Sequence, residues 1–231
     1  MISPTFSREL SLLRKYKHIA GIDEAGRGPI AGPVVSAAVI LDPDKIGKYR
    51  SATKWWIEVR DSKILSSRKR ALIARFIKYN CLDYAIGLAT HQEIDEINIH
   101  HASLLSMKRA LGNLKITPEM ALIDGKFFIP LDLAQSTVVQ KTIVDGDALV
   151  LSIAAASILA KVYRDDLMQK FDRQYREFGF ASNKGYNTAF HRKSLLRAGP
   201  CPIHRMTFPA VKNIMNTRFE FLIVRKQGEV A

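Results

Sequence analysis

The chain has 231 residues, enough for one large domain or for a domain with a small appendage. At 47% hydrophobic and 25% charged it has the composition of an ordinary globular protein, and no stretch reaches the roughly 20 apolar residues that a bilayer-crossing helix needs. The formal net charge of +13 favours an anionic partner, with nucleic acid first and an anionic membrane surface second.

The cysteines and the N-terminal segment both indicate a cytoplasmic protein. Cys81 and Cys201 are far apart and form no Cys-x-x-Cys spacing, which argues against a structural zinc site and against a disulfide framework. Residues 1–17 mix apolar with charged side chains and lack the continuous apolar core of a signal peptide.

The first predicted elements are a short helix and two strands. Residues 7–16 predict a helix with Leu10 and Leu13 on one face. The apolar run that begins at Ile19 predicts a buried strand, and residues 32–41 predict a β-prone strand. Because only a short turn separates the two strands, we expect them to pair antiparallel.

The first strand leads into two acids and a turn. Asp23 and Glu24 precede the sequence Gly26-Arg27-Gly28-Pro29, which favours a tight turn. Successive strand residues face opposite sides of a sheet, so both carboxylates can enter one site only if the strand ends there and the backbone turns. A plain surface turn is the alternative, but the full string favours a site that holds a metal ion against a phosphate.

The middle of the chain predicts alternating loops, helices and strands. Residues 43–60 predict a loop or small insertion, in which Trp55 and Trp56 either stack on bases or, as we favour, pack against the protein. Residues 66–79 predict a helix, residues 81–89 a strand and residues 91–113 a second helix. The inward residues expected for the two helices are Leu72, Ile73, Phe76 and Ile77, and Ile94, Ile97, Leu104, Leu105, Met107 and Leu111.

Two further strands lead into aspartates. Residues 120–124 predict a short apolar strand that ends in Asp124, and residues 137–144 predict a strand that precedes Asp145 and Asp147. Residues 149–175 predict a long helix, buried in its small and apolar first half and exposed over the charged residues 163–177.

The chain after Gly179 differs in composition and in its predicted elements. A polar loop at residues 183–188 precedes predicted helices over residues 188–197 and 208–224. We therefore expect an α/β protein with one central mixed β-sheet flanked by helices, comprising a main domain at residues 1–178 and a small helical C-terminal appendage at residues 179–231.

Four carboxylates form a candidate metal site: Asp23, Glu24, Asp124 and Asp147. Neighbouring strand ends can bring such side chains together, where they repel one another unless a cation compensates. Mg²⁺ or Mn²⁺ suits oxygen ligands, and two such ions about 4 Å apart assist phosphodiester hydrolysis. Taken alone, Asp124-Gly125 is most typical of a turn and Asp147 of an acid at a helix N-terminus, where Asp145 could stand instead, and spacing does not choose between Asp145 and Asp147.

The histidines predict no second metal site. His100 and His101 are adjacent on a predicted helix and do not share a face. We interpret His91, His191 and His204 as structural or surface residues.

The segment around the first acids resembles the signature of the type 2 ribonucleases H, in particular the bacterial ribonuclease HII family. The similar stretch is Asp23-Glu24-Ala-Gly26-Arg27-Gly28-Pro29. Further similar segments follow in the same order within residues 18–210, and they are Arg60-Asp-Ser-Lys63, Glu93-Ile-Asp-Glu-Ile-Asn98, Ile123-Asp-Gly125, Gly146-Asp147, residues 152–162, Gly185-Tyr186 and Pro202-Ile-His-Arg205.

The resemblance implies a ribonuclease H-like catalytic domain at residues 1–178 and a substrate-binding role for residues 179–231. It implies hydrolysis of the RNA strand of RNA–DNA hybrids with Mn²⁺ or Mg²⁺, and cleavage of DNA duplexes 5′ to an embedded ribonucleotide, leaving 5′-phosphate and 3′-hydroxyl ends. The implied catalytic metal ligands are Asp23, Glu24, Asp124 and Asp147, since the family's last acid directly follows a glycine. The implied substrate-binding residues are Gly26, Arg27, Gly28 and Tyr186, at the 2′-hydroxyl of an RNA-to-DNA junction, and Lys63, at a phosphate.

We expect a monomer, and a sliding-clamp contact through residues 219–231 is an alternative to the helix core that Phe219-Glu-Phe-Leu222 predicts. Ile64 and Asp145 depart from the family pattern and reduce the positive charge near the site. There are two alternative functions: another metal nuclease of the same fold, and a catalytically silent nucleic-acid-binding protein.

Overall fold

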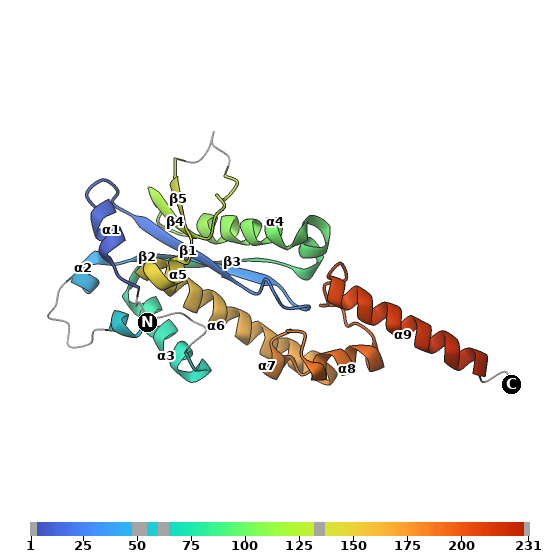
Figure 1. Cartoon of the computed structure of the whole chain (residues 1–231). Coiled ribbons are helices and arrows are strands. Elements are labelled where there is room, and N and C mark those ends of the chain that lie inside the picture. The colour runs from blue at the N-terminus through green and yellow to red at the C-terminus, as the bar shows by residue number, and fades with distance from the viewer. Residues whose placement is uncertain (1–3, 48–54, 60–64, 132–136, 229–231) are drawn as a thin grey trace.

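One central five-stranded sheet organises the protein, whose computed structural model describes residues 4–47, 55–59, 65–131 and 137–228 (Figure 1). The strands lie in the order β3-β2-β1-β4-β5. Their bounds are Ile19–Ala25 for β1, Val34–Leu41 for β2, Cys81–Ala89 for β3, Met120–Asp124 for β4 and Val139–Ile143 for β5. β2 pairs antiparallel with β1 and β3, whereas β4 pairs parallel with β1 and β5, so the expected mixed sheet and the antiparallel first pair are confirmed.

Helices cover both faces of this sheet. The helices and 3₁₀ turns of the described residues are α1 Ser7–Leu12, α2 Pro43–Gly47, η1 Trp55–Glu58, α3 Ser67–Asn80, α4 His91–Gly112, α5 Gly146–Leu149, α6 Leu151–Gln174, η2 Arg176–Phe178, α7 Phe180–Asn183, α8 Ala189–Ala198 and α9 Pro209–Gly228. Figure 1 shows α4 on one face of the sheet and α6 on the other. In the part of the chain that the structure describes, no helix combines the length and apolarity needed to cross a membrane.

Strand alternation divides the core into two layers. Along β2, Ala37 and Val39 pack with residues of α6, whereas Ala38 and Ile40 pack with residues of α4. The first half of α6 is buried all round, as predicted. Gly21 permits its close approach, because a Cβ on Gly21 would lie 2.2 Å from the backbone of Ser152. The core therefore presses α6 directly against the strand that carries the first two acids.

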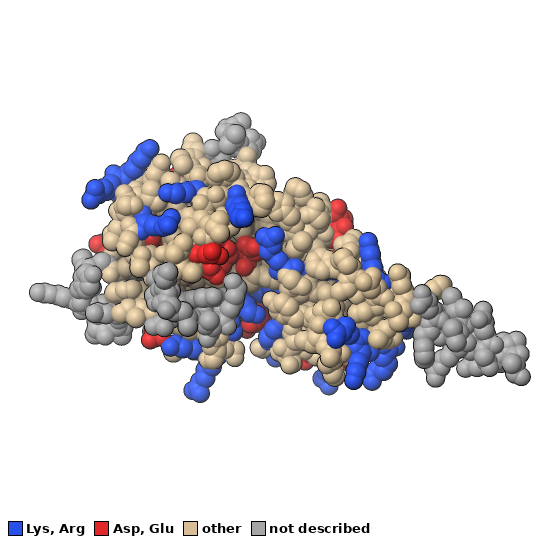
Figure 2. Space-filling model, viewed as in Figure 1, with Lys and Arg blue, Asp and Glu red and all other residues tan. Residues whose placement is uncertain are grey.

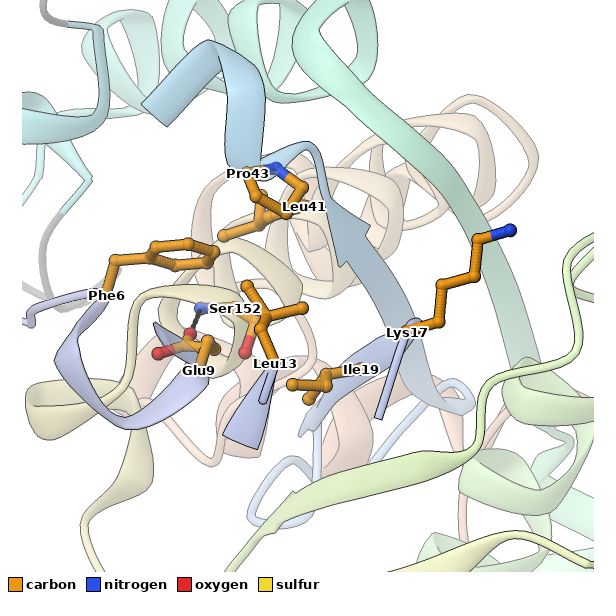
Figure 3. A pocket seen from close by; sticks show the side chains of 8 residues that line it. All are labelled: Phe6, Glu9, Leu13, Lys17, Ile19, Leu41, Pro43 and Ser152. Carbon is orange, nitrogen blue, oxygen red and sulfur yellow. Dashed lines mark hydrogen bonds between the residues drawn. The ribbon is translucent and has the colours of Figure 1, made fainter. Parts of the chain in front are cut away.

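The N-terminal segment secures the start of α6. Glu9 is 1% exposed, and one of its carboxylate oxygens accepts a 2.8 Å hydrogen bond from the backbone N–H of Ser152 (Figure 3). A carboxylate at a helix N-terminus satisfies a donor without an intrahelical partner and is favoured by the helix dipole. Burial raises the pKa of Glu9. The predicted apolar face of the first helix is therefore wrong at Leu10, which is 52% exposed, because α1 turns Glu9 inward instead.

The predicted inward face of α3 is half wrong. Leu72 and Phe76 are 52% and 40% exposed, whereas the buried residues are Arg70, Ile73, Ala74 and Ile77. Those four residues, at spacings of three, one and three, form one narrow stripe along the helix. Leu72 and Phe76 lie beside that stripe and face away from the core.

A kink changes the buried face of α4. Asn98 has φ 66° and ψ 166°, and its side-chain oxygen accepts hydrogen bonds from the N–H groups of His100 and His101, so it caps the second half of the helix. The helical phase shifts there, and Ile97, predicted to face inward, is 38% exposed. Small residues then face the sheet, where a Cβ on Gly87 would lie 2.2 Å from the Ser106 carbonyl.

The predicted helix at residues 149–175 is two helices. Val150 separates α5 from α6 in an extended conformation, because it forms a β-bridge with Thr5 of the N-terminal segment. The second half of α6 is not exposed throughout as predicted, since Arg164, Asp165 and Met168 are buried. This face of α6 packs against α7 and against Ile30 and Ala31.

The C-terminal helices pack on a cluster of their own. It joins residues before and after position 179: Ile30, Ala31, Met168, Phe178, Phe180, Leu195, Ile203, Val211 and Ile214. α9 packs through Val211 and Ile214 and then extends away from the body of the molecule (Figure 1). Phe219 is 67% exposed, so the prediction that it belongs to a helix core is wrong. The division at residues 1–178 and 179–231 stays a prediction.

Candidate active site

The ends of β1 and β4 bring three carboxylates together. The two strands run parallel and pair as far as Ile22 and Ile123, so the residues that follow, Asp23 and Asp124, lie near each other at the same end of this strand pair. One oxygen from each of Asp23, Glu24 and Asp124 lies within 4.8 Å of the others. The parallel register that the sequence could not specify is thus the cause of the cluster.

Glu24 reaches this cluster without the expected end of the strand. β1 continues through Ala25 and stays paired with β2, so Asp23 and Glu24 are successive residues inside one strand. The pairing with β4, however, stops at Ile22. Beyond Ile22 the edge of β1 that faces β4 is therefore open. The carboxylates of Asp23 and Glu24, which start on opposite faces of the strand, can both reach the space at this open edge.

Asp23 is the electrostatic centre of the site. It is 4% exposed, and its pKa lies well above the usual value because of burial and of repulsion from Glu24 and Asp124. Hydrogen bonds from Ser157 and from the Glu24 backbone N–H, the latter 2.6 Å long, oppose this shift. A buried carboxylate that is repelled by two neighbouring carboxylates is suited to binding a hard divalent cation. The charge of such a cation compensates the repulsion and favours the ionised form of the carboxylate.

Asp124 and Asp147 are linked through the turn between β5 and α5. An oxygen of Asp124 accepts a 2.7 Å hydrogen bond from the N–H of Gly146. A Cβ at Gly146 would lie 2.7 Å from Ile153, so this close approach suits glycine. Asp147, the next residue, is 9% exposed and lines the same hollow, although its oxygens are not within the 4.8 Å group.

The hollow at these acids has a volume of about 270 Å³. Its lining residues are Asp23, Glu24, Ala25, Gly26, Arg27, Gly28, Asp124, Asp147, Ser157, Lys161, Arg164 and Tyr186. Figure 2 shows acidic side chains gathered near the middle of this face, with lysine and arginine side chains around them. The hollow therefore contains carboxylates, which are suited to binding cations, and is surrounded by lysine and arginine side chains, which are suited to binding phosphates.

Two basic side chains that line the hollow form ion pairs with acidic residues. Arg27 forms a 3.2 Å ion pair with Glu24, and its side chain is 49% exposed. Lys161 forms a 2.6 Å ion pair with Asp165, and burial lowers the pKa of its ammonium group.

The loop from Gly26 to Gly32 is held by a buried arginine. The Arg205 guanidinium, which is 0% exposed, donates hydrogen bonds of 2.7–3.0 Å to the carbonyls of Gly26, Arg27, Pro29 and Gly32. Burial lowers the pKa of Arg205 to about 9, which leaves it charged at neutral pH. Because four carbonyls point inward to one guanidinium, the conformation of this glycine-rich loop is tightly specified.

A second buried arginine, Arg164, joins this loop to the segment before Tyr186. It is 1% exposed and donates to the carbonyls of Ala31, Pro33 and Lys184, at 3.2, 3.0 and 2.9 Å. Burial lowers its pKa to about 10. A Cβ on Gly26, whose φ is 101°, would lie 2.1 Å from the Arg164 Nε, so only glycine fits there.

Tyr186 lies beside the glycine loop at the hollow. It is 46% exposed, and a Cβ on Gly28 would lie 3.6 Å from its ring. Gly28 and Tyr186, which are far apart in the sequence, are therefore neighbours in the structure. Both could contact the same group of a bound substrate only if they lie this close together.

Most residues selected from the sequence lie at this hollow, and some important ones were missed. The structure brings Asp23, Glu24, Gly26, Arg27, Gly28, Asp124, Asp147 and Tyr186 to one place, whereas Asp145 is exposed and does not line the hollow. Lys63 and Ile64 lie outside the described residues. The structural roles of Arg164 and Arg205 were missed because charged residues are expected at surfaces. The only sequence signal was that Arg205 falls in a segment similar to the family.

The mixed sheet flanked by helices has the architecture of the ribonuclease H-like class, and its acidic hollow fits a nuclease that uses divalent metal ions. The family model described as Ribonuclease HII matches residues 20–211, and the chain belongs to this family. A ribonuclease HII of Syntrophotalea carbinolica is 45% identical over 93% of this chain and 96% of its own length, and one of Geotalea daltonii is 50% identical over 85% of each.

Solved structures agree with this assignment. The ribonuclease H2 of Pyrococcus horikoshii superposes with a TM-score of 0.70 and 27% identity, covering 87% of this chain and 98% of that one. A structure titled as the complex of PCNA with ribonuclease HII from Archaeoglobus fulgidus gives a TM-score of 0.59 at 27% identity, covering 85% and 96%. The protein is accordingly an endoribonuclease that hydrolyses the RNA strand of RNA–DNA hybrids, and its family depends on divalent metal ions.

Proposed function

We propose that Asp23, Glu24, Asp124 and Asp147 are the catalytic carboxylates, and that they hold two divalent ions, Mn²⁺ or Mg²⁺. The clustering of three of them within 4.8 Å around the buried Asp23 carries this proposal. Ions held there supply positive charge to the attacking and leaving oxygens of a phosphodiester. Asp124 is oriented for this role by the Gly146 N–H, and Asp23 by Ser157 and the Glu24 N–H.

The glycine loop and Tyr186 select the substrate in this proposal. Backbone groups of Gly26, Arg27 and Gly28 approach the 2′-hydroxyl of the ribonucleotide at an RNA-to-DNA junction, and the Tyr186 ring packs on its sugar or base. Their support is the shared hollow and the short distance between Gly28 and Tyr186. The enzyme then cuts 5′ to a ribonucleotide embedded in duplex DNA and leaves 5′-phosphate and 3′-hydroxyl ends, with Lys63 as a phosphate contact.

A DNA duplex with one ribonucleotide, incubated with Mn²⁺ or Mg²⁺, tests the proposal. Asp124→Asn and Asp147→Asn should each lower the cleavage rate by roughly 10³-fold, since each removes a charge that stabilises the reacting phosphate. Asp145→Asn is the matched control, because this neighbouring acid is exposed and asparagine tolerates its φ of 54°. Wild-type failure to cut, or equal losses for Asp145→Asn and Asp147→Asn, would refute the assignment.

The C-terminal helix is the candidate surface for a sliding-clamp contact. Phe219 is 67% exposed on a helix that extends away from the body of the molecule (Figure 1). The Archaeoglobus protein is named in a complex with PCNA, which supports a similar contact here. Phe219→Ala should weaken co-elution with a bacterial sliding clamp without changing cleavage of short duplexes, and unchanged co-elution would exclude Phe219.

A further inference from the structure

Two histidines lie buried directly behind the loop that carries Tyr186. His191 of α8 and His204 are 0% and 1% exposed. Phe180 packs edge-on against His191 at 5.3 Å between ring centroids, and Phe178 against His204 at 4.8 Å. Buried imidazoles in an aromatic cage must have their nitrogens satisfied by specific partners, so their hydrogen bonds reveal their protonation.

His204 contacts Cys201 through its Nδ1. The N–H of Cys201 donates a 2.9 Å hydrogen bond to this nitrogen. The same Nδ1 lies 3.1 Å from the Cys201 carbonyl oxygen and 3.2 Å from the Cys201 Sγ. Cys201 thus offers both a donor and an acceptor, and the direction of the hydrogen bonds is set at the other end, by His191 and Tyr186.

The Tyr186 carbonyl fixes the direction. The Nδ1 of His191 lies 2.9 Å from this carbonyl oxygen, which can only accept, so Nδ1 carries the proton and donates. In the neutral ring Nε2 of His191 is then an acceptor, and the Nε2 of His204, 3.0 Å away, donates to it. Nδ1 of the neutral His204 ring therefore carries no proton and accepts from the Cys201 N–H. A directed chain of hydrogen bonds thus runs from the Cys201 N–H through both rings to the backbone of Tyr186.

This chain completes the anchoring of the Tyr186 loop. Three successive carbonyls accept from three separate parts of the protein: Lys184 from Arg164, Gly185 from the Ile30 N–H at 2.8 Å, and Tyr186 from His191. The residue after His204 is Arg205, which holds the neighbouring glycine loop. Adjacent residues therefore hold the two segments, the glycine loop and the Tyr186 loop, that are proposed to contact the junction.

We propose that His191 and His204 are positioning residues that orient Tyr186 for recognition of the ribonucleotide junction. The inference rests on the proposed substrate role of Tyr186. It requires that the hydrogen bonds keep this direction, with one proton on each ring. If His191 Nδ1 carried no proton, it and the Tyr186 carbonyl oxygen would be two facing acceptors, and the hydrogen bond that holds Tyr186 would be lost. Burial supports the neutral forms, since it lowers the pKa of His191 and lowers that of His204 to about 4.

Nitrogen NMR of the wild-type histidines tests the chain without any variant. At neutral pH, His191 should show the proton on Nδ1, which is the less common form in water, and His204 should show it on Nε2. Scalar or cross-peak connectivity should link the two Nε2 atoms. A protonated cationic ring at either position, or His191 with its proton on Nε2, would overturn the proposal.

Two substitutions of His191 test its consequence for specificity. His191→Asn keeps a donor near the position of Nδ1, whereas His191→Leu removes it. The measured quantity is the ratio of kcat/KM for a single-ribonucleotide duplex to kcat/KM for an RNA–DNA hybrid. Loss of one positioning hydrogen bond should lower this ratio about fivefold to tenfold in His191→Leu, and His191→Asn should restore it to within about twofold of wild type.

Ser194→Ala is the control, because Ser194 is a buried residue of the same helix whose hydroxyl donates to the Glu177 carbonyl, outside the Tyr186 loop. It should reduce stability without changing the ratio. An unchanged ratio in His191→Leu, or an equal change in Ser194→Ala, would overturn the inference while wild-type junction cleavage left the proposed function intact. Absence of junction cleavage by the wild type would instead refute the proposed function, and the NMR result would still report on the chain.

Discussion

Replacing Arg205 by lysine is the sharpest test of how the glycine loop is held. The guanidinium spans four carbonyls, of Gly26, Arg27, Pro29 and Gly32, with its nitrogens 2.7–3.0 Å from their oxygens. A lysine ammonium is one nitrogen on a flexible stem and cannot reach all of them. Arg205→Lys therefore leaves two or three buried carbonyls without their donor.

The expected loss of stability is large. A hydrogen bond from a charged donor contributes about 1.5–3 kcal/mol, and an unsatisfied buried acceptor costs about 1–3 kcal/mol. Allowing for relaxation and for the desolvation that the retained ammonium still requires, Arg205→Lys should lower the free energy of unfolding by about 3–5 kcal/mol. This is a substantial part of the roughly 5–15 kcal/mol that stabilises a typical domain.

Urea denaturation followed by circular dichroism measures this loss. Arg192→Lys is the matched control, because Arg192 is exposed and its side-chain hydrogen bond to the Asn187 carbonyl is long, at 3.4 Å. The control should lose less than about 0.5 kcal/mol. A loss below about 1 kcal/mol for Arg205→Lys would refute the claim that this guanidinium holds the loop.

Three further outcomes follow from the site. Asp124→Asn should raise the free energy of unfolding in metal-free buffer by on the order of 1 kcal/mol, because Asp124 is one of the charges that oppose ionisation of Asp23. Added Mg²⁺ should stabilise the wild type more than this variant, and a metal-free variant no more stable than wild type would contradict the repulsion. Tyr186→Ala should lower cleavage at a single ribonucleotide about tenfold more than cleavage of a hybrid, as product mapping will show, and an unchanged junction preference would remove Tyr186 from substrate selection. The pKa of His204 falls from 6.5 to about 4 on burial, so the unfolded chain takes up a proton first as the pH falls. Stability should therefore be intact above about pH 6.5 and fall toward pH 4, by about 2 kcal/mol at pH 5 from this residue alone. Denaturation of His204→Gln should show a shallower dependence over that window, and an equal slope would contradict this origin.

Sequence patterns predicted the elements that depend on local geometry. The apolar runs before Asp23 and Asp124 became β1 and β4, and the small residues after Val150 became the buried half of α6. Glycine after the acids marked the turns because only glycine accepts φ near 101° at Gly26 or 96° at Gly125. The acids themselves were recognisable because carboxylates at strand ends are a small and chemically distinctive set.

Some predictions failed where tertiary contacts determine burial. Leu72, Phe76 and Ile97 fit helical spacing, yet they are exposed because α3 contacts the core through one stripe and Asn98 interrupts α4. Glu9 is charged, yet it is buried because it caps α6 from 143 residues away. Periodicity describes the backbone of one element and contains no information about which other element covers it.

The sequence by itself determined which chemical groups the protein has available: four acids beside strands and turns, a glycine-rich loop and one tyrosine. Only the tertiary structure decided how they meet. The parallel register of β1 and β4 places Asp23 beside Asp124, and the turn between β5 and α5 brings Asp147 to the hollow while Asp145 stays exposed. The buried Arg205 and the two histidines acquire their roles in the same way, because a charged or polar side chain can be buried only where distant backbone groups satisfy it.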